Sequence, residues 1–417
     1  MGCPIVPFVM SMFEQWLQCV SCTARYRELT DFAGCSVCAR QGKLSPLEPR
    51  YDYTTSGQIE PDCGMPGIWR WHALLPRVDA ANRITLHEGN TPLIQLRDWS
   101  GAARLYFKNE TTNPTWTWKD RANAISVSAA RNSGFNNLVA VTTGNHGVSA
   151  AAYAAAARLH SVIFCHEMAP ELQLALMGLH GARVFRGGHR DSLQRQLVAL
   201  GDWFPATTLC PRSGCSNPFG IEGFKTIAFE LFYQLGRNVP DRVFIPVGSG
   251  DGLYGIWKGF QELERVGAID KAPRLFACQA AGVAPYVKAF LQGARRLTPV
   301  DPVSTIALSI AEPIGGDHAL HAIYESGGAA TSVTDDEILA ARLALGRQGL
   351  ALEPASAAAY AVARTLQSEG KSNERWVVVG TGTALKWPRT LLDGYHLPEV
   401  LSATVNCLGE LPTRYLE

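Results

Sequence analysis

The sequence has no excess of charge of either sign. Among its 417 residues, 38 Lys and Arg stand against 37 Asp and Glu, so the formal net charge is +1, and the basic residues form no cluster. This balance argues against nucleic acid or an anionic membrane as a partner. Residues 1–18 are apolar in places, but they have neither a cationic leader nor a run long enough to span a bilayer. These absences predict a cytoplasmic protein.

Repeats and low-complexity tracts are also missing, whereas apolar residues are plentiful. Hydrophobic residues make up 47% of the chain and charged residues 18%, which is enough for a large core, two lobes and an appendage. From Leu105 onward, strand-like segments alternate with helical ones, which predicts an α/β fold of parallel sheets with crossover helices. Ligands of such folds bind at the carboxyl ends of the strands.

One lysine lies where a predicted strand passes into a helix. Residues 113–121 read Asn-Pro-Thr-Trp-Thr-Trp-Lys-Asp-Arg, with the lysine at 119. A lysine in an aromatic, poorly solvated pocket has its ammonium form disfavoured, and its neutral amine can form a Schiff base. Trp116 and Trp118 could supply that dry wall. Taken alone, the Lys-Asp-Arg run also fits a solvated helix start with its acid in the first turn.

A second strand-to-helix turn favours the binding of an anion. The apolar residues 138–141 lead through Thr142 and Thr143 to Gly144-Asn145-His146-Gly147 and an alanine-rich helix over 148–158. The glycines allow a sharp turn, while Thr142, Asn145 and the first helical amides present hydrogen-bond donors. This arrangement suits the carboxylate of an amino acid.

Two more strands end in glycine-bearing turns. Residues 242–247 are followed by Gly248-Ser249-Gly250-Asp251-Gly252 and an amphipathic helix. Backbone amides at such a helix start can bind a phosphate. A simple tight turn would have the same pattern. Residues 376–379 end in Gly380-Thr381-Gly382-Thr383.

These four motifs, in this order, resemble the fold type II pyridoxal phosphate enzymes, and specifically their threonine synthase-like branch. The resemblance covers nearly the whole chain and extends to five segments between the motifs, at residues 87–93, 108–110, 222–230, 353–357 and 385–386. It implies a two-lobe architecture like that of the tryptophan synthase beta chain, and a homodimer. The implied domains are a zinc-ribbon-like leader (1–50), a large cofactor-binding lobe (51–135 and 210–417) and a small mobile lobe (136–209).

The resemblance also implies roles for single residues. Lys119 forms the Schiff base with pyridoxal 5'-phosphate, Asn145 bonds the cofactor 3'-oxygen, and Thr381 meets the pyridine nitrogen. The phosphate is held by the backbone of Gly248, Ser249, Gly250, Asp251 and Gly252. Once released, Lys119 is the natural base for the substrate α-proton. Thr143 is a candidate second proton carrier or, alternatively, a structural hydroxyl.

Four of the eleven cysteines have the spacing of a structural metal site. Cys19 and Cys22 form one Cys-x-x-Cys pair and Cys35 and Cys38 form another, with twelve residues between the two pairs. Two such pairs suit tetrahedral zinc, which would drive the folding of a segment too short to fold by apolar burial alone. The alternative is a degenerate pair of knuckles that binds no metal.

Several positions depart from the family pattern for threonine synthase. The family's phosphate-binding Asn, Ser and Arg correspond here to Gly214, Cys215 and Gly220, and the loss of two such contacts, worth about 1.5–3 kcal/mol each, should weaken phosphate binding about a hundredfold or more.

Trp116 and Trp118 add bulk to the same pocket, and Phe224 replaces the usual glutamine. His146 makes the turn resemble that of amino acid dehydratases and acts through its amide or its imidazole. Asp251 would be repelled by a bound phosphate and is expected to face away from it.

We therefore predict a pyridoxal phosphate-dependent lyase or synthase that carries out β-elimination or β-replacement on an amino acid, with γ-replacement open and a second nucleophilic substrate possible. Its substrate-binding residues would include Cys215 together with Thr142, Thr143, Asn145, His146, Trp116 and Trp118. One alternative is an authentic threonine synthase, with the phosphate of O-phosphohomoserine held by Arg212 or Lys225. Another is a cofactor-binding protein without activity, whose site the tryptophans have closed.

Overall fold

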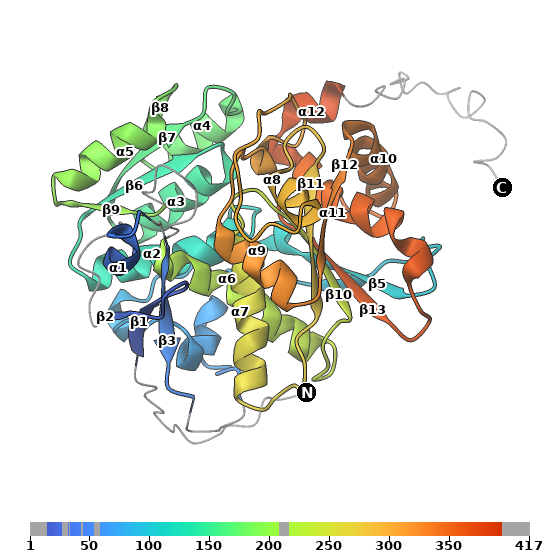
Figure 1. The fold of residues 1–417 in the computed structure, drawn as a ribbon. Coiled ribbons are helices and arrows are strands. Elements are labelled where there is room, and N and C mark those ends of the chain that lie inside the picture. Colours follow the sequence, from blue (N-terminus) through green and yellow to red (C-terminus); the bar gives the residue numbers. More distant parts are fainter. Residues whose placement is uncertain are drawn as a thin grey trace, which may run out of the picture.

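The computed structural model confirms the α/β class (Figure 1). It describes residues 15–26, 32, 34–42, 45–53, 59–207 and 217–393. Within these residues the strands form one six-stranded, one four-stranded and one three-stranded sheet. The two larger sheets consist mainly of parallel strands whose connections contain helices, as the alternation of apolar segments predicts.

The six-stranded sheet has the order β12-β11-β10-β13-β5-β4. All of its neighbouring strands are parallel except β4, which pairs antiparallel with β5. Its strands are β4 (Leu93–Gln95), β5 (Arg104–Asn109), β10 (Arg242–Pro246), β11 (Arg274–Ala280), β12 (Ala329–Val333) and β13 (Arg375–Gly380).

Helices cover both faces of this sheet, which explains why each of its central strands contains an unbroken apolar run. Val243 and Ile245 of β10 belong to a core that includes α6 (Pro218–Gln234) and α7 (Asp251–Arg265). Phe244, which points to the other face, packs in a second core with α10 (Asp335–Gly346) and α11 (Pro354–Thr365). Side chains alternate between the faces of a strand, so burial of both faces requires an unbroken apolar run.

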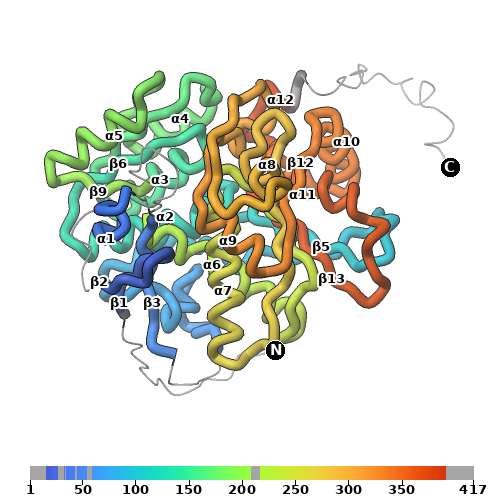
Figure 2. Tube along the Cα trace, in the orientation of Figure 1, coloured from blue at the N-terminus to red at the C-terminus, as the bar shows by residue number. Residues whose placement is uncertain are grey.

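The four-stranded sheet is entirely parallel, with the order β8-β7-β6-β9. It is built from β6 (Asn137–Thr142), β7 (His160–Cys165), β8 (Arg183–Arg186) and β9 (Trp203–Pro205), with the helices α3 (Asn145–Ala156), α4 (Glu171–Leu179) and α5 (Arg190–Ala199). These elements form the upper left of the molecule (Figure 2). The predicted domain limits at residues 135 and 209 enclose them and remain a prediction.

The N-terminal segment forms the small antiparallel sheet β2-β1-β3 and one short helix. Its elements are β1 (Gln15–Cys19), β2 (Arg25–Tyr26), α1 (Ser36–Ala39) and β3 (Leu47–Tyr51). Strand β3 reaches α6 and α7, where Tyr51 donates a hydrogen bond of 2.5 Å to Glu222 and Lys258 donates to the Pro49 carbonyl at 2.5 Å. The segment is thereby attached to the two helices that cover one face of the large sheet.

The remaining helices are α2 (Lys119–Asn132), α8 (Pro285–Leu291), α9 (Asp317–Glu325), α12 (Pro388–Asp393) and the short 3-10 helices Gly67–Leu74, Ala80–Asn82, Glu110–Thr112, Leu308–Ile310, Gln367–Glu369 and Ala384–Lys386. None of the helices in the described part of the chain is both long and apolar enough to cross a membrane.

Candidate active site

A cavity of about 400 Å³ lies at the carboxyl ends of β6, β10 and β13. It brings together twelve of the residues predicted from the sequence, from all four motifs: Trp118, Lys119, Thr142, Thr143, Asn145, His146, Gly248, Ser249, Gly250, Asp251, Gly252 and Thr381. Two others are not found there. Trp116 does not line the cavity and its side chain is 44% exposed, and Cys215 lies outside the described residues.

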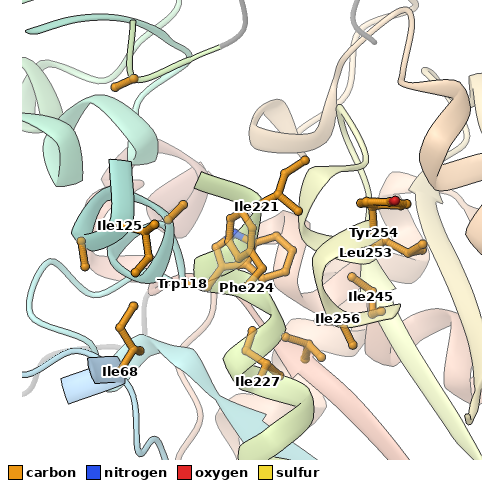
Figure 3. Packing of buried hydrophobic residues seen from close by; sticks show 14 of the residues in the cluster. Ile68, Trp118, Ile125, Ile221, Phe224, Ile227, Ile245, Leu253, Tyr254 and Ile256 are labelled. Atoms are coloured by element: carbon orange, nitrogen blue, oxygen red, sulfur yellow. The ribbon is translucent and has the colours of Figure 1, made fainter. Parts of the chain in front are cut away.

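Lys119 is the first residue of α2, and its amine lies between two aromatic rings. Nζ is 5.6 Å from the ring centre of Trp118 and 5.5 Å from that of Phe224, and these two rings pack against each other with their centres 4.8 Å apart (Figure 3). Among the residues that the structure describes, none forms a hydrogen bond or ion pair with Nζ. Burial lowers the pKa of Lys119, opposed in part by Asp251 and other carboxylates of the cavity.

The first turn of α2 is fixed by a buried network of charges. The Arg121 guanidinium donates to both oxygens of Glu110, at 2.7 and 2.9 Å, and to both oxygens of Glu230, at 2.7 and 2.8 Å. Lys108 adds a second cation, 2.6 Å from Glu230. All four side chains are buried, and each charge has a partner of opposite sign, as buried ions require. This network orients the helix that carries Lys119.

The loops that carry Lys119 and Thr381 are tied to each other. The backbone N–H of Trp118 donates to the Thr381 carbonyl at 3.0 Å, and the Thr117 hydroxyl donates to the same oxygen at 3.0 Å. The Thr381 hydroxyl lies 3.0 Å from the Ser356 hydroxyl and 3.4 Å from a carboxylate oxygen of Glu353. The two motifs, more than two hundred and fifty residues apart in sequence, therefore share one rigid wall of the cavity.

The turn before α3 is stabilised by its own threonine. Thr142 Oγ1 accepts hydrogen bonds from the amides of Gly144 and Gly147, at 2.8 and 3.0 Å, so this hydroxyl is used mainly to hold the turn. Gly144 has φ of 155°, and a side chain there would also collide with Gln173.

Asn145 is 5% exposed; its Nδ2 donates to Glu353 at 2.6 Å, whereas its buried Oδ1 has no partner in the described protein. A buried amide oxygen without a donor points to a ligand in the cavity.

His146 also lines the cavity, and its imidazole is uncharged at neutral pH. Burial, together with the nearby charge of Lys119, lowers the pKa of His146 to about 3. Its buried Nε2 has no hydrogen-bond partner in the described part of the chain. The imidazole can therefore act as a neutral hydrogen-bonding group at pH 7, but its charged form is not present there to act as a general acid.

Two glycines at the start of α7, Gly250 and Gly252, have no room for a side chain. A Cβ on Gly250, whose φ is 102°, would lie 2.2 Å from the Tyr286 hydroxyl oxygen, and a Cβ on Gly252 would lie 2.2 Å from the Trp118 ring. The first amides of α7 have no acceptor within the helix and face the cavity with the positive end of its dipole. Asp251, predicted to face away from a bound phosphate, lines the cavity, and one of its carboxylate oxygens lies 3.2 Å from His318 Nε2.

Sequence reasoning missed four charged residues of the cavity wall. Arg190 and Asp191 come from the start of α5, Glu312 from the loop before α9, and Glu353 from the residue before α11. Only Glu353 had a local signal, as the first residue of a segment that resembles the family. The other three come from segments without a turn or strand pattern, so their convergence depends on the tertiary fold.

The four cysteines of the N-terminal segment converge, as their spacing predicts. Their sulfur atoms all lie within 4.8 Å of one another, with Cys19 and Cys38 3.7 Å apart and Cys22 and Cys35 3.5 Å apart. A tetrahedral ion with Zn–S bonds of about 2.3 Å would require S···S separations of about 3.8 Å. The cluster could therefore bind zinc with only a small adjustment.

Comparison with known proteins identifies the class. Residues 84–382 match the family model described as pyridoxal-phosphate dependent enzyme, and the chain belongs to that family. The cavity agrees with its cofactor, because it combines a lysine amine whose pKa desolvation lowers, an unpaired amide oxygen and a glycine-lined helix start.

Within the family, the chain is similar to threonine synthases. It is 36% identical to "Threonine synthase" of Methanosarcina acetivorans over 414 residues, covering 94% of this chain and 98% of that protein. It is 37% identical to "Threonine synthase" of Methanocaldococcus jannaschii over 358 residues, covering 83% and 87%. The chain is thus a pyridoxal phosphate-dependent enzyme of the threonine synthase-like group.

Solved structures agree with the predicted fold type II architecture. A fungal L-serine ammonia-lyase from Rhizomucor miehei superposes with a TM-score of 0.62 at 20% identity, covering 71% of this chain and 94% of that one. The processed form of threonine deaminase isoform 2 from Solanum lycopersicum gives 0.62 at 19% identity, covering 82% and 98%. At these identities the likeness concerns the fold.

Proposed function

We propose that this enzyme eliminates or replaces a leaving group on the side chain of an amino acid, with Lys119 as the lysine that binds the cofactor and then moves the substrate proton. The observation that carries the proposal is the amine of Lys119, which lines the cavity between two aromatic rings and forms no hydrogen bond or ion pair with any described residue. A desolvated lysine with a lowered pKa is both a nucleophile for an aldehyde and a base near neutral pH.

The other cavity residues would hold the two ligands. The amides from Gly248 to Gly252 would bind the cofactor phosphate, Thr381 its ring nitrogen and Asn145 its 3'-oxygen. Pyridoxal phosphate, when bound, supplies an electron sink for the bond broken at the α-carbon. The turn at Thr143 would bind the substrate carboxylate, because the first amides of α3 face the same cavity.

The first substrate candidate is O-phosphohomoserine, which would make the protein a threonine synthase. The similarity to threonine synthases over nearly the full length supports this candidate more strongly than it supports a changed substrate. Of the two cations predicted for the phosphate, Lys225 is instead held by Glu222 and Glu262, at 2.6 and 3.0 Å, and Arg212 lies outside the described residues. Arg190 is the one cation besides Lys119 in the described cavity wall, so we assign it to the phosphate.

The second candidate is an amino acid whose leaving group is not a phosphate, as the sequence predicts. It is favoured by the charges around Arg190, because Asp191 and Glu312 also line the cavity, Glu312 interacts electrostatically with Arg190 and Asp191, and both carboxylates would oppose a phosphate dianion. Gly220 also lines the cavity and offers no side chain to a phosphate. β-Elimination or β-replacement of an uncharged leaving group fits this distribution.

An inactive cofactor-binding protein is the least supported alternative. It requires the two tryptophans to close the site, yet Trp116 lies outside the cavity, and about 400 Å³ remains beside Trp118. The predicted homodimer and the predicted cytoplasmic location remain predictions.

Turnover with O-phosphohomoserine separates the two substrates. Release of threonine and inorganic phosphate at enzymatic rates would establish the first candidate, and Arg190→Gln should then raise KM for this substrate. If no phosphate is released, a panel of amino acids with β and γ leaving groups should be tested for exchange of the α-proton in deuterated buffer. Absence of exchange with every member of the panel would contradict the proposed function.

A further inference from the structure

Glu312 is a carboxylate of the cavity wall to which the fold gives no partner. It lies in the loop between the 3-10 helix Leu308–Ile310 and α9, and it is partly exposed. Among the residues that the structure describes, none forms a hydrogen bond or an ion pair with its side chain. Arg190, the cation that acts on it most strongly, donates a hydrogen bond of 3.2 Å to the Thr142 carbonyl instead. An unpaired carboxylate on a cavity wall calls for an explanation by a ligand.

The loop holds this side chain against the glycine turn that we assign to the cofactor phosphate. The Glu312 amide donates to the Ile310 carbonyl at 2.9 Å, and the Pro313 carbonyl accepts from the Val300 amide at 2.9 Å. The stem of the side chain packs over Gly248, because a Cβ built there would lie 3.3 Å from Glu312 Cγ. The carboxylate therefore lies beside the proposed phosphate site.

The charges that face Glu312 favour its protonated form. Burial raises the pKa of Glu312. Arg190 and Lys119 oppose this shift, whereas Asp191 and Asp251 add to it. A phosphate dianion on the neighbouring glycine turn would add to it further, because like charges disfavour the ionised form. Burial shifts the pKa of Lys119 the opposite way, and two groups displaced in opposite directions can serve as a neutral acid and a neutral base.

The other carboxylates of the cavity are either paired or exposed. Glu353 accepts a hydrogen bond of 2.6 Å from Asn145, and Asp251 lies 3.2 Å from a ring nitrogen of His318. Asp191 is exposed at the start of α5. The carboxylate before α9 is thus the one in the described cavity wall that is partly buried and makes no hydrogen bond or ion pair.

We propose that Glu312 is a second catalytic residue, the general acid that protonates the leaving group, and that the substrate is an amino acid whose leaving group departs through a hydroxyl or ether oxygen. This inference rests on the proposed function, in which Lys119 removes the α-proton. The electron pair of the Cα–H bond then forms a second bond between Cα and Cβ, and the bond from Cβ to oxygen breaks. That oxygen keeps the electron pair, takes the proton of Glu312 and leaves as water or an alcohol. Proton exchange with solvent restores both residues.

The test compares leaving groups that need a proton with one that leaves as a stable anion. Wild-type, E312Q and E312D holoenzymes are given L-serine, O-methyl-L-serine and β-chloro-L-alanine. Exchange of the α-proton in deuterated buffer and release of the leaving group are measured separately. E312Q should release water and methanol about 10²-fold more slowly or worse, whereas chloride release and α-proton exchange should stay within about threefold of wild type. E312D retains an acid and should recover part of the loss.

A pH profile and a control variant separate proton donation from a structural role. The release of water and methanol by wild type should fall as pH rises and Glu312 loses its proton, and this alkaline fall should be absent from E312Q. Asp191→Asn is the matched control, because it removes a carboxylate of the same cavity that is exposed. Any effect of this control should be equal for all three substrates.

The outcomes distinguish this inference from the proposed function. If E312Q slows all three leaving groups equally, Glu312 is not the acid. Wild-type exchange of the α-proton without release of water or methanol would also overturn the inference, although the proposed function would stand. A wild type that exchanges the α-proton of no amino acid would contradict the proposed function itself. If E312Q does not fold, E312D decides the point, because its shorter acid should slow the release of water but not that of chloride.

Discussion

Lys119 and Arg121 are two cations on the same turn of one helix, but one is ion-paired on all sides and the other makes no ion pair with a described residue. Arg121 is enclosed by the carboxylates of Glu110 and Glu230, and all of its contacts are 2.7–3.2 Å long. Lys119 is directed into the cavity between two aromatic rings and has no partner in the described chain. The neighbouring network makes the backbone rigid, and this rigidity holds the Lys119 amine in the cavity without a direct ion pair to a described residue.

The buried lysines sharpen the contrast. Each of the four in the described part of the chain donates at least one hydrogen bond to a carboxylate or a backbone carbonyl: Lys108, Lys225, Lys258 and Lys386. Lys119, which lines the cavity, makes no such bond to a described residue, and it lies where the chemistry needs a free amine.

The largest expected effect comes from removal of the unpaired amine. Lys119→Ala should abolish the cofactor adduct that borohydride makes permanent, and should lower activity by about 10³-fold or more, since nucleophile and base are lost together. Peptide mass spectrometry after borohydride treatment identifies the labelled residue. Lys386→Gln is the control, because Lys386 is buried but donates to the Thr115 carbonyl, and this variant should retain the adduct. A label on any lysine other than 119 would contradict the assignment.

Removal of the paired cation should reduce stability instead. Arg121→Met leaves two buried carboxylates without their partner, so the free energy of unfolding should fall by about 3–5 kcal/mol. Urea unfolding followed by circular dichroism measures this change. The matched control is Arg186→Met, which breaks a 2.7 Å pair with the exposed Glu171 and should cost about 0–1 kcal/mol. Equal and small effects in both variants would show that the buried network does not hold the helix.

The sequence predicted those parts of the site that have a local signature. Lys119, Asn145, the glycine loop and Thr381 each lie where a strand ends at a glycine-bearing turn or at a helix start, and parallel strands bring such ends to one edge. Trp116 differs from Trp118 for a local reason: its φ of 60° turns the backbone, so that its side chain is 44% exposed and does not line the cavity, whereas Trp118, two residues on, does. Arg190 and Glu312 have no turn or strand signal, and only the packing of distant segments places them in the same cavity as Lys119.

A pH dependence of stability should distinguish the two cations further. Burial lowers the pKa of Lys119 below its ordinary value of 10.5, so between the folded pKa and 10.5 the unfolded chain binds more protons than the native one. The cofactor-free protein should therefore gain stability as pH rises through this window. The Lys119→Met variant lacks this titrating group. Its free energy of unfolding should exceed that of wild type most at the lower end of the window, and this difference should become smaller toward pH 10.5. Urea unfolding of both proteins at a series of pH values gives this difference, and a difference independent of pH would mean that Lys119 is not desolvated.

The smallest effect is expected at His146, which lies beside Lys119 and shares its burial. Because the pKa of His146 is lowered to about 3, its imidazole is already neutral between pH 6 and 9 and gives no proton to a leaving group from a charged state. His146→Asn keeps the backbone amide of the turn and a hydrogen-bonding side chain, so kcat/KM should change by less than about tenfold and the pH profile should keep its shape. Loss of the acidic limb of that profile in the variant would show instead that the imidazole titrates during turnover. In that case the imidazole would share the proton transfers in this cavity with Lys119 and Glu312.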